Sequence, residues 1–390
     1  MRRIASRALA CAAAGGCAYL AIALWRVRRF SCEVSRRDER VPDAGTTGTR
    51  ARFEPGVSVL KPLHGLEPGL AENLATFLDQ EYPVYQVVFC ATSRDDPAVP
   101  IAAAAMGRFP GVDAEVVVRA ARDVANPKIA NILNAVGLAK HDVLVVADAD
   151  IRVERSYLRR VVAPFEDLAV GAVTALYGAL PADGLVSTLA AMHVNDHFAP
   201  SVLVAQMVEP LRYCFGSTMA VRREVLDEIG GFAALGSTIA DDHRLGELVC
   251  SAGCRVALAR CVVRTVVGDA SLGDVWRREL RWARTIRSVR PLGSTLAVVT
   301  LALPLALLAW AAAPRSPRRR ALLGVAAALR CALHLTARRA FAPEGPRTLR
   351  LVYHRDLLSL AIWVASRFGR TVDWRREPHD LGPHGSLRAS

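Results

Sequence analysis

The sequence predicts an α/β fold, with a parallel sheet covered by helices on both faces, between an N-terminal membrane anchor and a C-terminal membrane region. Short apolar runs of strand length alternate with amphipathic segments through the middle of the chain, which is the pattern of such a sheet. Longer apolar stretches, rich in alanine and leucine, lie on either side of this middle part and suit membrane helices.

Strands and helices are expected to alternate from residue 57 onward. The expected strands are residues 57–60, 86–90, 114–118 and 143–147. The expected helices are residues 70–78, 98–109, 129–139 and 243–252. In sheets of this kind ligands bind beyond the carboxyl ends of the strands, which is where Asp96 and Asp148 fall.

Residues 9–25 are apolar and alanine-rich, with arginines on both sides. A cleaved signal peptide is the alternative, but no small-residue cleavage site follows the apolar run before the arginines. We therefore expect an uncleaved anchor within residues 1–30. More arginines follow at Arg36, Arg37 and Arg40, so the positive-inside rule places most of the chain on the cytoplasmic side of an inner membrane.

Three apolar stretches near the C-terminus predict a membrane region. Residues 292–313 are long enough to span a bilayer, although Pro304 lies inside them. The next stretch, residues 321–335, is short and carries Arg330. Residues 357–364 follow the charged pair Arg355-Asp356 and fit an interfacial or re-entrant helix. We expect a multi-pass protein, with the number of spans left open.

The charge balance restricts the partners. Lys and Arg number 50 against 37 Asp and Glu, a formal charge of +13, and nearly all the basic residues are arginine, which favours phosphate groups and anionic lipid surfaces. No zinc finger, RNA-recognition signature or basic aromatic strip is found, so we expect no nucleic-acid partner. The nine cysteines form no pairing pattern, which favours small buried side chains in a reducing compartment.

Three acidic clusters stand in order along the chain: Asp95-Asp96, Asp148-Ala149-Asp150 and Asp241-Asp242. The middle cluster directly follows a buried strand, where a carboxylate is costly unless a cation binds it. Asp148 and Asp150 at spacing i, i+2 can share one hard cation, Mg²⁺ or Mn²⁺, which suits a diphosphate. Asp242 suits a general base, while Asp241 is equally well explained as a helix cap. The order indicates nucleotide-sugar chemistry.

A basic and aromatic motif follows the last cluster. Arg278 and Arg281 lie at i, i+3 on one helical face and are able to clamp a diphosphate, and Lys128 adds charge near the nucleotide. Trp282 is able to stack on a sugar or on the acceptor. The alternative is a juxtamembrane basic patch with an interfacial tryptophan, since a membrane stretch starts at Leu292.

Taken in order, these motifs resemble family 2-type glycosyltransferases and, more closely, the ceramide glucosyltransferase-like family 21. The resemblance covers roughly residues 55–290. The C-terminal part of the chain also resembles the branch tied to bacterial hopanoid biosynthesis. The residues that carry this second resemblance are 356–359 and 372–375. The matching runs in the main part are residues 57–65, 82–83, 95–98, 126–128, 148–153, 216–222, 225–227, 230–231, 240–242 and 278–282.

The resemblance implies a GT-A fold, a Rossmann-like mixed sheet flanked by helices, and an inverting mechanism. It divides the chain into five segments. These are an anchor at residues 1–30, a linker at 31–54, a catalytic domain at 55–290, membrane-associated helices at 291–370 and a polar tail at 371–390.

The resemblance also implies roles for single residues. Asp242 would be the catalytic base, and Asp148 with Asp150 would hold Mg²⁺ or Mn²⁺. Eukaryotic ceramide glucosyltransferases tend to have Asp-Ser-Gly where this chain has Asp148-Ala149-Asp150, so metal ligation looks more like that of ordinary family 2 enzymes. The residues expected to bind the nucleotide sugar are Asp96, Lys128, Asp148, Arg278, Arg281 and Trp282.

The predicted function is transfer of a sugar from UDP-N-acetylglucosamine or UDP-glucose to a membrane-lipid hydroxyl, on a hopanoid polyol. A lipid acceptor is expected because the segment at Trp282 runs almost directly into the membrane stretch at Leu292. A ceramide glucosyltransferase is the near alternative. A processive synthase would have more spans, a hydrolase would have histidine-rich ligation, and a non-catalytic membrane scaffold would lack some of these carboxylates.

Overall fold

The computed structural model of the protein describes residues 2–38, 53–374, 377–382 and 385–388. The chain divides into two compact units. The sheet unit contains Val34–Tyr177 and Pro210–Val266. The helical unit contains Met1–Glu33, Gly178–Glu209 and Val267–Ser390. Of the linker expected at residues 31–54, residues 31–38 continue the first helix and residues 39–52 lie outside the described part.

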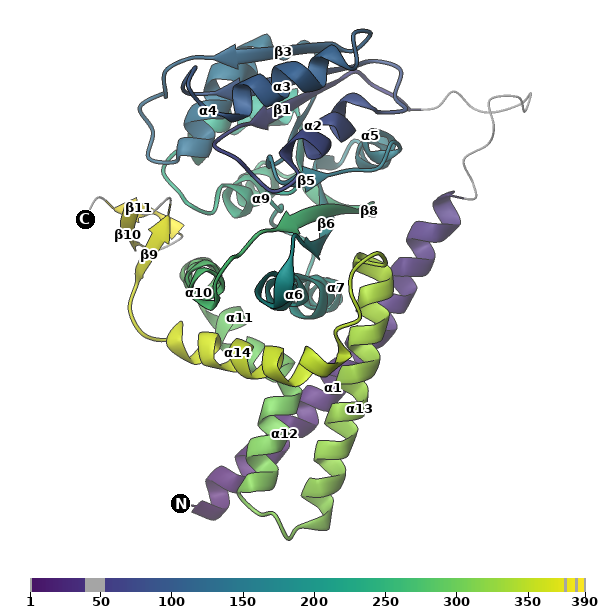
Figure 1. The fold of residues 1–390 in the computed structure, drawn as a ribbon, viewed down its shortest axis with the longest axis vertical. Helices are drawn as coiled ribbons and strands as arrows, with labels where there is room; N and C mark the ends of the chain where they lie inside the picture. Colours follow the sequence, from purple (N-terminus) through teal and green to yellow (C-terminus); the bar gives the residue numbers. More distant parts are fainter. Residues whose placement is uncertain (1, 39–52, 375–376, 383–384, 389–390) are drawn as a thin grey trace. The chain divides into compact units, whose positions relative to one another are not determined.

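The sheet unit is built on a mixed eight-stranded sheet in the order β3-β2-β1-β4-β7-β6-β8-β5 (Figure 1). Strands β1 to β4 pair in parallel, as the alternating pattern predicts, whereas β7 runs antiparallel to β4 and β6, and β5 runs antiparallel to β8. The mixed sheet expected from the resemblance is confirmed. The strands are β1 Val57–Pro62, β2 Tyr85–Ala91, β3 Asp113–Val118, β4 Val143–Val146, β5 Ile151–Arg152, β6 Val170–Pro181, β7 Met219–Arg222 and β8 Arg255–Val267.

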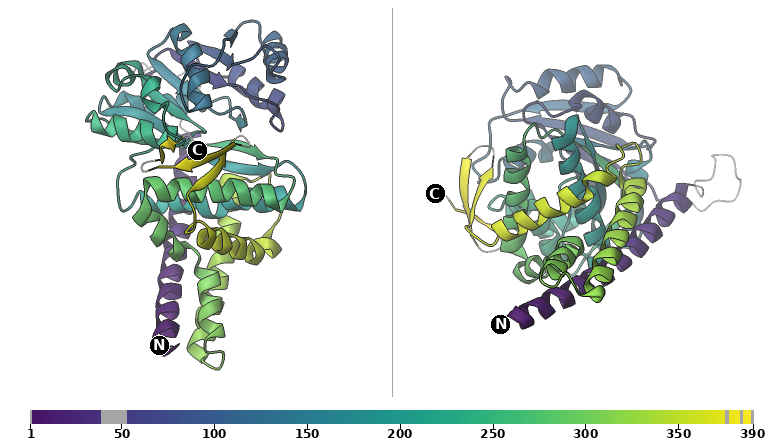
Figure 2. Two further views of the ribbon diagram at one scale, coloured as in Figure 1. Left: turned by 90° about the vertical axis from the view of Figure 1, so that its left-hand side faces the viewer. Right: turned by 60° about the horizontal axis from the view of Figure 1, so that its bottom comes forward.

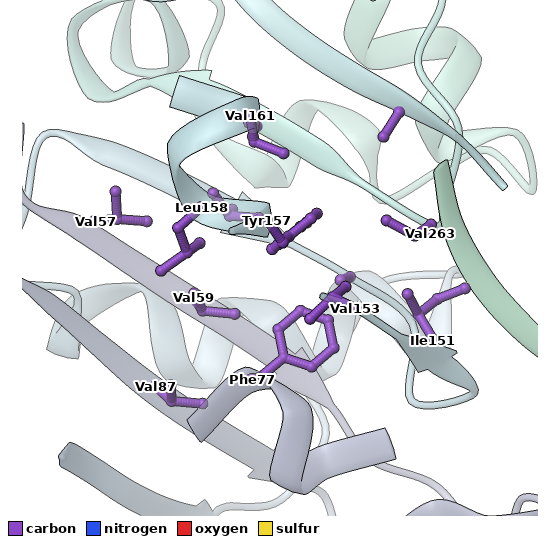
Figure 3. Close-up of a cluster of buried hydrophobic side chains, with 14 of the residues drawn as sticks. Val57, Val59, Phe77, Val87, Ile151, Val153, Tyr157, Leu158, Val161 and Val263 are labelled. Atoms are coloured by element: carbon purple, nitrogen blue, oxygen red, sulfur yellow. The ribbon is translucent and has the colours of Figure 1, made fainter. Parts of the chain in front are cut away.

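Helices cover both faces of this sheet because successive side chains along its strands point to opposite faces and are apolar on both. On β1, Val57 and Val59 join one hydrophobic cluster and Leu60 joins the other. Figure 3 shows the first cluster, in which Phe77 and Tyr157 lie among valines of the sheet. Its helices are α2 Leu70–Leu78, α3 Ala98–Gly107 and α5 Tyr157–Val162. The second cluster is covered by α4 Pro127–Ala135, α8 Arg223–Glu228 and α9 Asp241–Ser251.

Two helices of the sheet unit begin earlier than the sequence predicts. Helix α4 starts at Pro127, because the Asn126 side chain accepts hydrogen bonds from the backbone N–H groups of Lys128 and Ile129. It ends in a 3₁₀ turn at Val136–Leu138. Helix α9 starts at Asp241, two residues before the predicted helix, so the last acidic cluster lies in its first turn.

The helical unit contains the long apolar helices and a small C-terminal sheet. The segment expected as a polar tail holds the antiparallel strands β9 Thr371–Trp374, β10 Glu377–Leu381 and β11 Leu387–Arg388. The helices are α1 Arg2–Asp38, α6 Gly184–His193, a π-helical turn Val194–Phe198, α7 Ala199–Ala205, α10 Leu272–Val289, α11 Pro291–Leu296, α12 Ala302–Ala311, α13 Pro317–Phe341 and α14 Val352–Ala365.

Among the described residues, two helices are long and apolar enough to cross a membrane: Ser6–Ser35 within α1, and α13. The apolar stretch at residues 321–335, which the sequence analysis described as short, lies within the 25-residue helix α13. The helix is longer than the apolar stretch because it continues through polar residues at both ends. Its Arg330 is tolerated because the side chain is buried and paired with Asp196 and Asp356.

The continuous span expected at residues 292–313 is broken. Pro291–Thr300 and Ala302–Ala311 bend by 65°, and they make a third candidate span only if the bent pair counts as one. Pro304 explains the break, since it has no N–H to bond the carbonyl of Thr300. Helix α12 packs beside α1 and α13, as Figures 1 and 2 show, through Ala306, Ala13 and Ala326.

Replacing Phe77 by alanine should lower the free energy of unfolding by about 3–5 kcal/mol, because it leaves a cavity in the core. Phe77 is fully buried, and its ring meets that of Tyr157 edge-on with centroids 5.6 Å apart. Leu168→Ala is the control, since that side chain is 82% exposed, and it should change stability by less than about 0.5 kcal/mol. Equilibrium unfolding measures both, and equal losses would contradict the assigned core.

Candidate active site

In the sheet unit, Lys128 lies among four carboxylates. This cluster is beyond the C-terminal end of β4 and the N-terminal end of β7, which are antiparallel. The Lys128 ammonium lies 2.8 Å from Oδ1 of Asp148 and 3.1 Å from Oδ2 of Asp241. Lys128 stands in the first turn of α4, and Asn126, which caps that helix, also donates to the carbonyl of Thr238 at 2.8 Å. One asparagine therefore fixes the lysine and the loop that leads to Asp241.

Asp148 lies in the turn that follows β4. Its backbone N–H donates to the Gly216 carbonyl at 3.3 Å, and its own carbonyl accepts from Ile151 and from the Lys61 ammonium. A Cβ on residue 216 would stand 2.7 Å from Oδ2 of Asp148 and 3.3 Å from Nζ of Lys128. Only glycine leaves room for this carboxylate, which explains the glycine that opens the run at residues 216–222.

Lys61 and Glu67 belong to this region although the sequence analysis did not select them. Burial lowers the pKa of Lys61 to about 7 despite the carboxylates of Asp150 and Asp148. Loss of surrounding water, followed by the charges of the same two aspartates, raises the pKa of Glu67 to about 7. Lys61 lies inside the apolar pattern of β1, and only its charge, unusual in a buried strand, was a signal in the sequence.

Asp150 is half-buried and lies near the negative charge of Asp148. The Thr265 hydroxyl donates to Oδ2 of Asp150 at 2.6 Å. Burial, and then the charge of Asp148, raise the pKa of Asp150. Burial alone would lower the pKa of Lys128, but Asp148 and Asp241 outweigh it and the pKa lies above its usual range. The cluster therefore holds more negative charge than its lysines neutralise.

Asp242 is oriented by two backbone amides. The N–H of Gly216 donates to its Oδ2 at 3.1 Å, and the N–H of His243 donates to its Oδ1 at 2.8 Å. Burial and the charge of Asp241 raise the pKa of Asp242 to about 7. A carboxylate with this pKa and a fixed orientation is suited to accept a proton near neutral pH.

The donor set fits a divalent cation that binds together with phosphate groups. Within the described part of the chain, no group of three or more His, Cys, Asp or Glu side chains is arranged to hold a metal. Mg²⁺, however, is usually bound by one or two carboxylates, with substrate phosphates and water as the other ligands. Asp148 and Asp150 are such a pair, and a cation between them would relieve their repulsion.

Asp96 is buried where the loop after β1 meets the start of α3. Its oxygens accept from the N–H of Gly65, at 3.0 and 3.1 Å, and from the N–H of Ala98 at 2.9 Å. His64 lies 3.6 Å from the same carboxylate. These bonds connect β1 to α3, and contact of Asp96 with a nucleotide stays a prediction.

Arg278, Arg281 and Trp282 lie on α10, in the helical unit. Arg278 pairs with Asp269, and its guanidinium stands 5.0 Å from the centroid of the Trp282 ring. The Nε and Nη2 atoms of Arg278 are buried and have no hydrogen-bond partner among the described residues. Buried donors of this kind are rare in native proteins, and they suit an anionic ligand.

A buried ion pair holds the same helix in place. Glu279 accepts two hydrogen bonds from Arg355 of α14, at 2.8 and 2.7 Å, and Arg355 also donates to the Leu189 carbonyl of α6. His193 stacks on Trp282 with centroids 6.1 Å apart, and burial lowers its pKa to about 3. His197 lies 3.1 Å from Asp356. His197 is thus buried and His193 half-buried, and both are held by contacts within the helical unit.

Comparison with known proteins defines the class of this protein. The sequence model of glycosyl transferase family 21 matches residues 8–387. Ceramide glucosyltransferase 3 of Caenorhabditis elegans is 25% identical over 231 residues, which are 59% of this chain and 50% of the relative. The ceramide glucosyltransferase of Gibberella zeae is 30% identical over 133 residues, 32% of this chain and 25% of the relative. The chain spans about half the length of the first of these relatives.

One solved structure shares the fold over nearly the whole chain. It is the mannosyltransferase PcManGT of Pyrobaculum calidifontis, in complex with GDP-Man and Mn²⁺, with a TM-score of 0.53 and 21% identity over 94% of this chain and 99% of that one. The mixed sheet and the family match together define a glycosyltransferase. The chain belongs to glycosyl transferase family 21.

Arg355→Met should destabilise the protein by about 3–5 kcal/mol, because it leaves the Glu279 carboxylate buried without a counter-charge. The double variant Arg355→Met/Glu279→Leu should recover most of the loss, since it removes both charges. Arg277→Gln is the control on the same helix, because its pair with Asp274 is exposed and pairs of this kind contribute little to stability. Unfolding of detergent-solubilised protein measures all three. A double variant as unstable as the single one would contradict the assignment.

Proposed function

We propose that this protein transfers a sugar from a UDP-sugar to a hydroxyl group of a membrane lipid, with inversion at the anomeric carbon. The observation that carries the proposal is the carboxylate cluster around Lys128, with excess negative charge beside the oriented Asp242. Membership of family 21 and the presence of two candidate membrane helices support a lipid-directed enzyme. The protein would cross the inner membrane more than once, and its catalytic domain would lie on the cytoplasmic side.

Asp242 acts as the general base in this proposal. Its carboxylate takes the proton of the acceptor hydroxyl while that oxygen attacks the anomeric carbon from the face opposite the diphosphate. The new glycosidic bond forms as the bond from carbon to the diphosphate oxygen breaks, and the nucleoside diphosphate leaves. A base of this kind typically contributes about 10²–10⁴-fold to the rate. The two amides on Asp242 keep the carboxylate in one orientation.

The leaving diphosphate needs positive charge around it. Mg²⁺ or Mn²⁺, held by Asp148 and Asp150, would supply that charge when bound. The mannosyltransferase PcManGT, which has a similar fold and was solved in complex with GDP-Man and Mn²⁺, supports this proposal. Lys128, Arg278 and Arg281 are proposed to bind the phosphates. Trp282 and Asp96 complete the proposed nucleotide-sugar contacts.

The donor is proposed to be UDP-N-acetylglucosamine or UDP-glucose, and the acceptor a hopanoid polyol, as the resemblance of the tail at residues 356–359 indicates. A second candidate is formation of glucosylceramide. The observation that favours it is the name of the curated relatives, which are ceramide glucosyltransferases. A scaffold that keeps the fold without catalysis is the alternative from another class.

Asp242→Asn should bind the UDP-sugar nearly as well as the native protein and lose about 10²–10⁴-fold in turnover, because the amide accepts no proton. The assay offers UDP-glucose and UDP-N-acetylglucosamine, each with a hopanoid polyol and with ceramide, to detergent-solubilised protein with Mg²⁺ or Mn²⁺.

A glycosylated lipid made by the native protein and absent with the variant identifies the donor and the acceptor together. Lost UDP-sugar binding in a folded Asp242→Asn protein would contradict the role as base. Absence of both transfer and UDP binding in the native protein would favour the scaffold.

The rate should depend on pH through Asp242. The base works as the carboxylate, and its pKa is raised to about 7, so kcat/KM should rise about tenfold per pH unit up to about pH 7 and then level off. Asp241→Asn removes the neighbouring charge that helps to raise this pKa, so it should move the inflection to lower pH. Initial rates between about pH 5.5 and 8.5 measure both profiles. A flat native profile in this range would show that a carboxyl with an ordinary pKa is the base.

A further inference from the structure

Three arginines of the helical unit meet at the C-terminal end of α14. Arg284 donates to the carbonyl of Phe368 at 2.9 Å and to the carbonyl of Thr371, and Arg287 donates to the carbonyl of Gly369. Arg367 lies two residues after the end of α14 and donates to Ser294 of α11. These contacts attach α10 and α11 to α14, but their acceptors are all neutral groups.

No carboxylate forms an ion pair with Arg284, Arg287 or Arg367 in the described part of the chain. Other arginines of the helical unit do have such partners, for example Arg278 with Asp269 and Arg355 with Glu279. Burial, and then the charge of Arg287, lower the pKa of both Arg284 and Arg367. The three guanidinium groups therefore repel one another, and a phosphate bound among them would relieve that repulsion.

Exposed apolar side chains lie on α11, which Arg367 contacts, and next to Arg367 in the sequence. Leu292 and Leu296 of α11 are 72% and 59% exposed, and Phe368 is 69% exposed. Trp363 of α14 donates to the carbonyl of Ser294 at 2.9 Å, so α11 and α14 are held next to each other. Positive charge beside exposed apolar side chains is the composition of a surface that meets both the head groups and the acyl chains of a bilayer.

The orientation of α14 agrees with such a surface. Figures 1 and 2 show α14 running across the direction of α12 and α13, which it contacts. Helix α13 is a candidate span, and α12 belongs to the bent pair. A helix that crosses the spans near one end lies along the membrane surface, so its C-terminal arginine is at the level of the lipid head groups.

We propose that Arg284, Arg287 and Arg367 form a binding site for the phosphate head group of an anionic phospholipid, with its acyl chains against Leu292, Leu296 and Phe368. The site is separate from the proposed transfer chemistry, because none of these residues belongs to the carboxylate cluster or to the motif at residues 278–282. Arginine favours phosphate because its planar fork of N–H donors matches the phosphate oxygens.

The test titrates the full-length protein in a nonionic detergent with phosphatidylglycerol and, separately, with phosphatidylcholine, and follows the rise in melting temperature. The native protein should bind phosphatidylglycerol more tightly. Arg287→Gln/Arg367→Gln should weaken that binding about 30-fold, at about 1 kcal/mol for each basic residue near a membrane surface. The matched control is Arg108→Gln/Arg260→Gln, which removes two exposed arginines from the sheet unit and should change the affinity less than about threefold.

Arg287→Lys/Arg367→Lys separates loss of charge from loss of structure, because lysine keeps the charge. It should keep part of the preference for phosphatidylglycerol and bind this lipid more tightly than the glutamine variant does, although less tightly than the native protein, because lysine lacks the planar fork of donors. The proposal is overturned if the glutamine variant binds phosphatidylglycerol like its control, if the lysine variant loses binding as fully as the glutamine variant, or if the native protein binds both lipids equally. If inorganic pyrophosphate alone raised the melting temperature as much as phosphatidylglycerol does, the arginines would be assigned to a soluble phosphate, and the proposal would also be overturned.

Discussion

The arrangement of the candidate site depends on the Lys128 ammonium. Four aspartates converge beyond the ends of the sheet strands, and such a group is unstable unless cations neutralise it. Lys128 contacts Asp148 and Asp241 directly, and the cap at Asn126 fixes its position. The lysine joins the turn after β4 to the start of α9. It therefore sets where Asp242 stands relative to the pair proposed to hold the metal.

The incomplete neutralisation of this cluster is what makes it chemically useful. Asp150 and Asp242 have raised pKa values because burial and neighbouring carboxylates disfavour their charged forms. The proposed divalent cation and diphosphate would add charges of both signs to the same place, so donor binding and the protonation of Asp242 would be linked. Gly216 supports both sides of this arrangement, since it leaves room for Asp148 and donates its N–H to Asp242.

The helical unit also buries charged side chains, but there each of them has a partner of opposite charge. Arg355 is paired with Glu279, and Arg330 with Asp196 and Asp356. These pairs connect α14 to α10 and to α13. Asp356 belongs to the tail motif that suggests a hopanoid acceptor, yet in the structure it is a partner in this network. The unmatched arginines near Phe368 stand out against this background.

The sequence by itself determined the local features. Periodicity and turn residues predicted the parallel strands and both ends of helix α2, because these features depend on neighbours along the chain. The order of the acidic clusters could be read directly from the sequence. The antiparallel strands and the length of α13 were decided by tertiary packing. The same is true of Lys61 and the Arg355–Glu279 pair. Their partners lie far apart in the sequence, and a buried charge reveals its role only when folding brings its counter-charge to it.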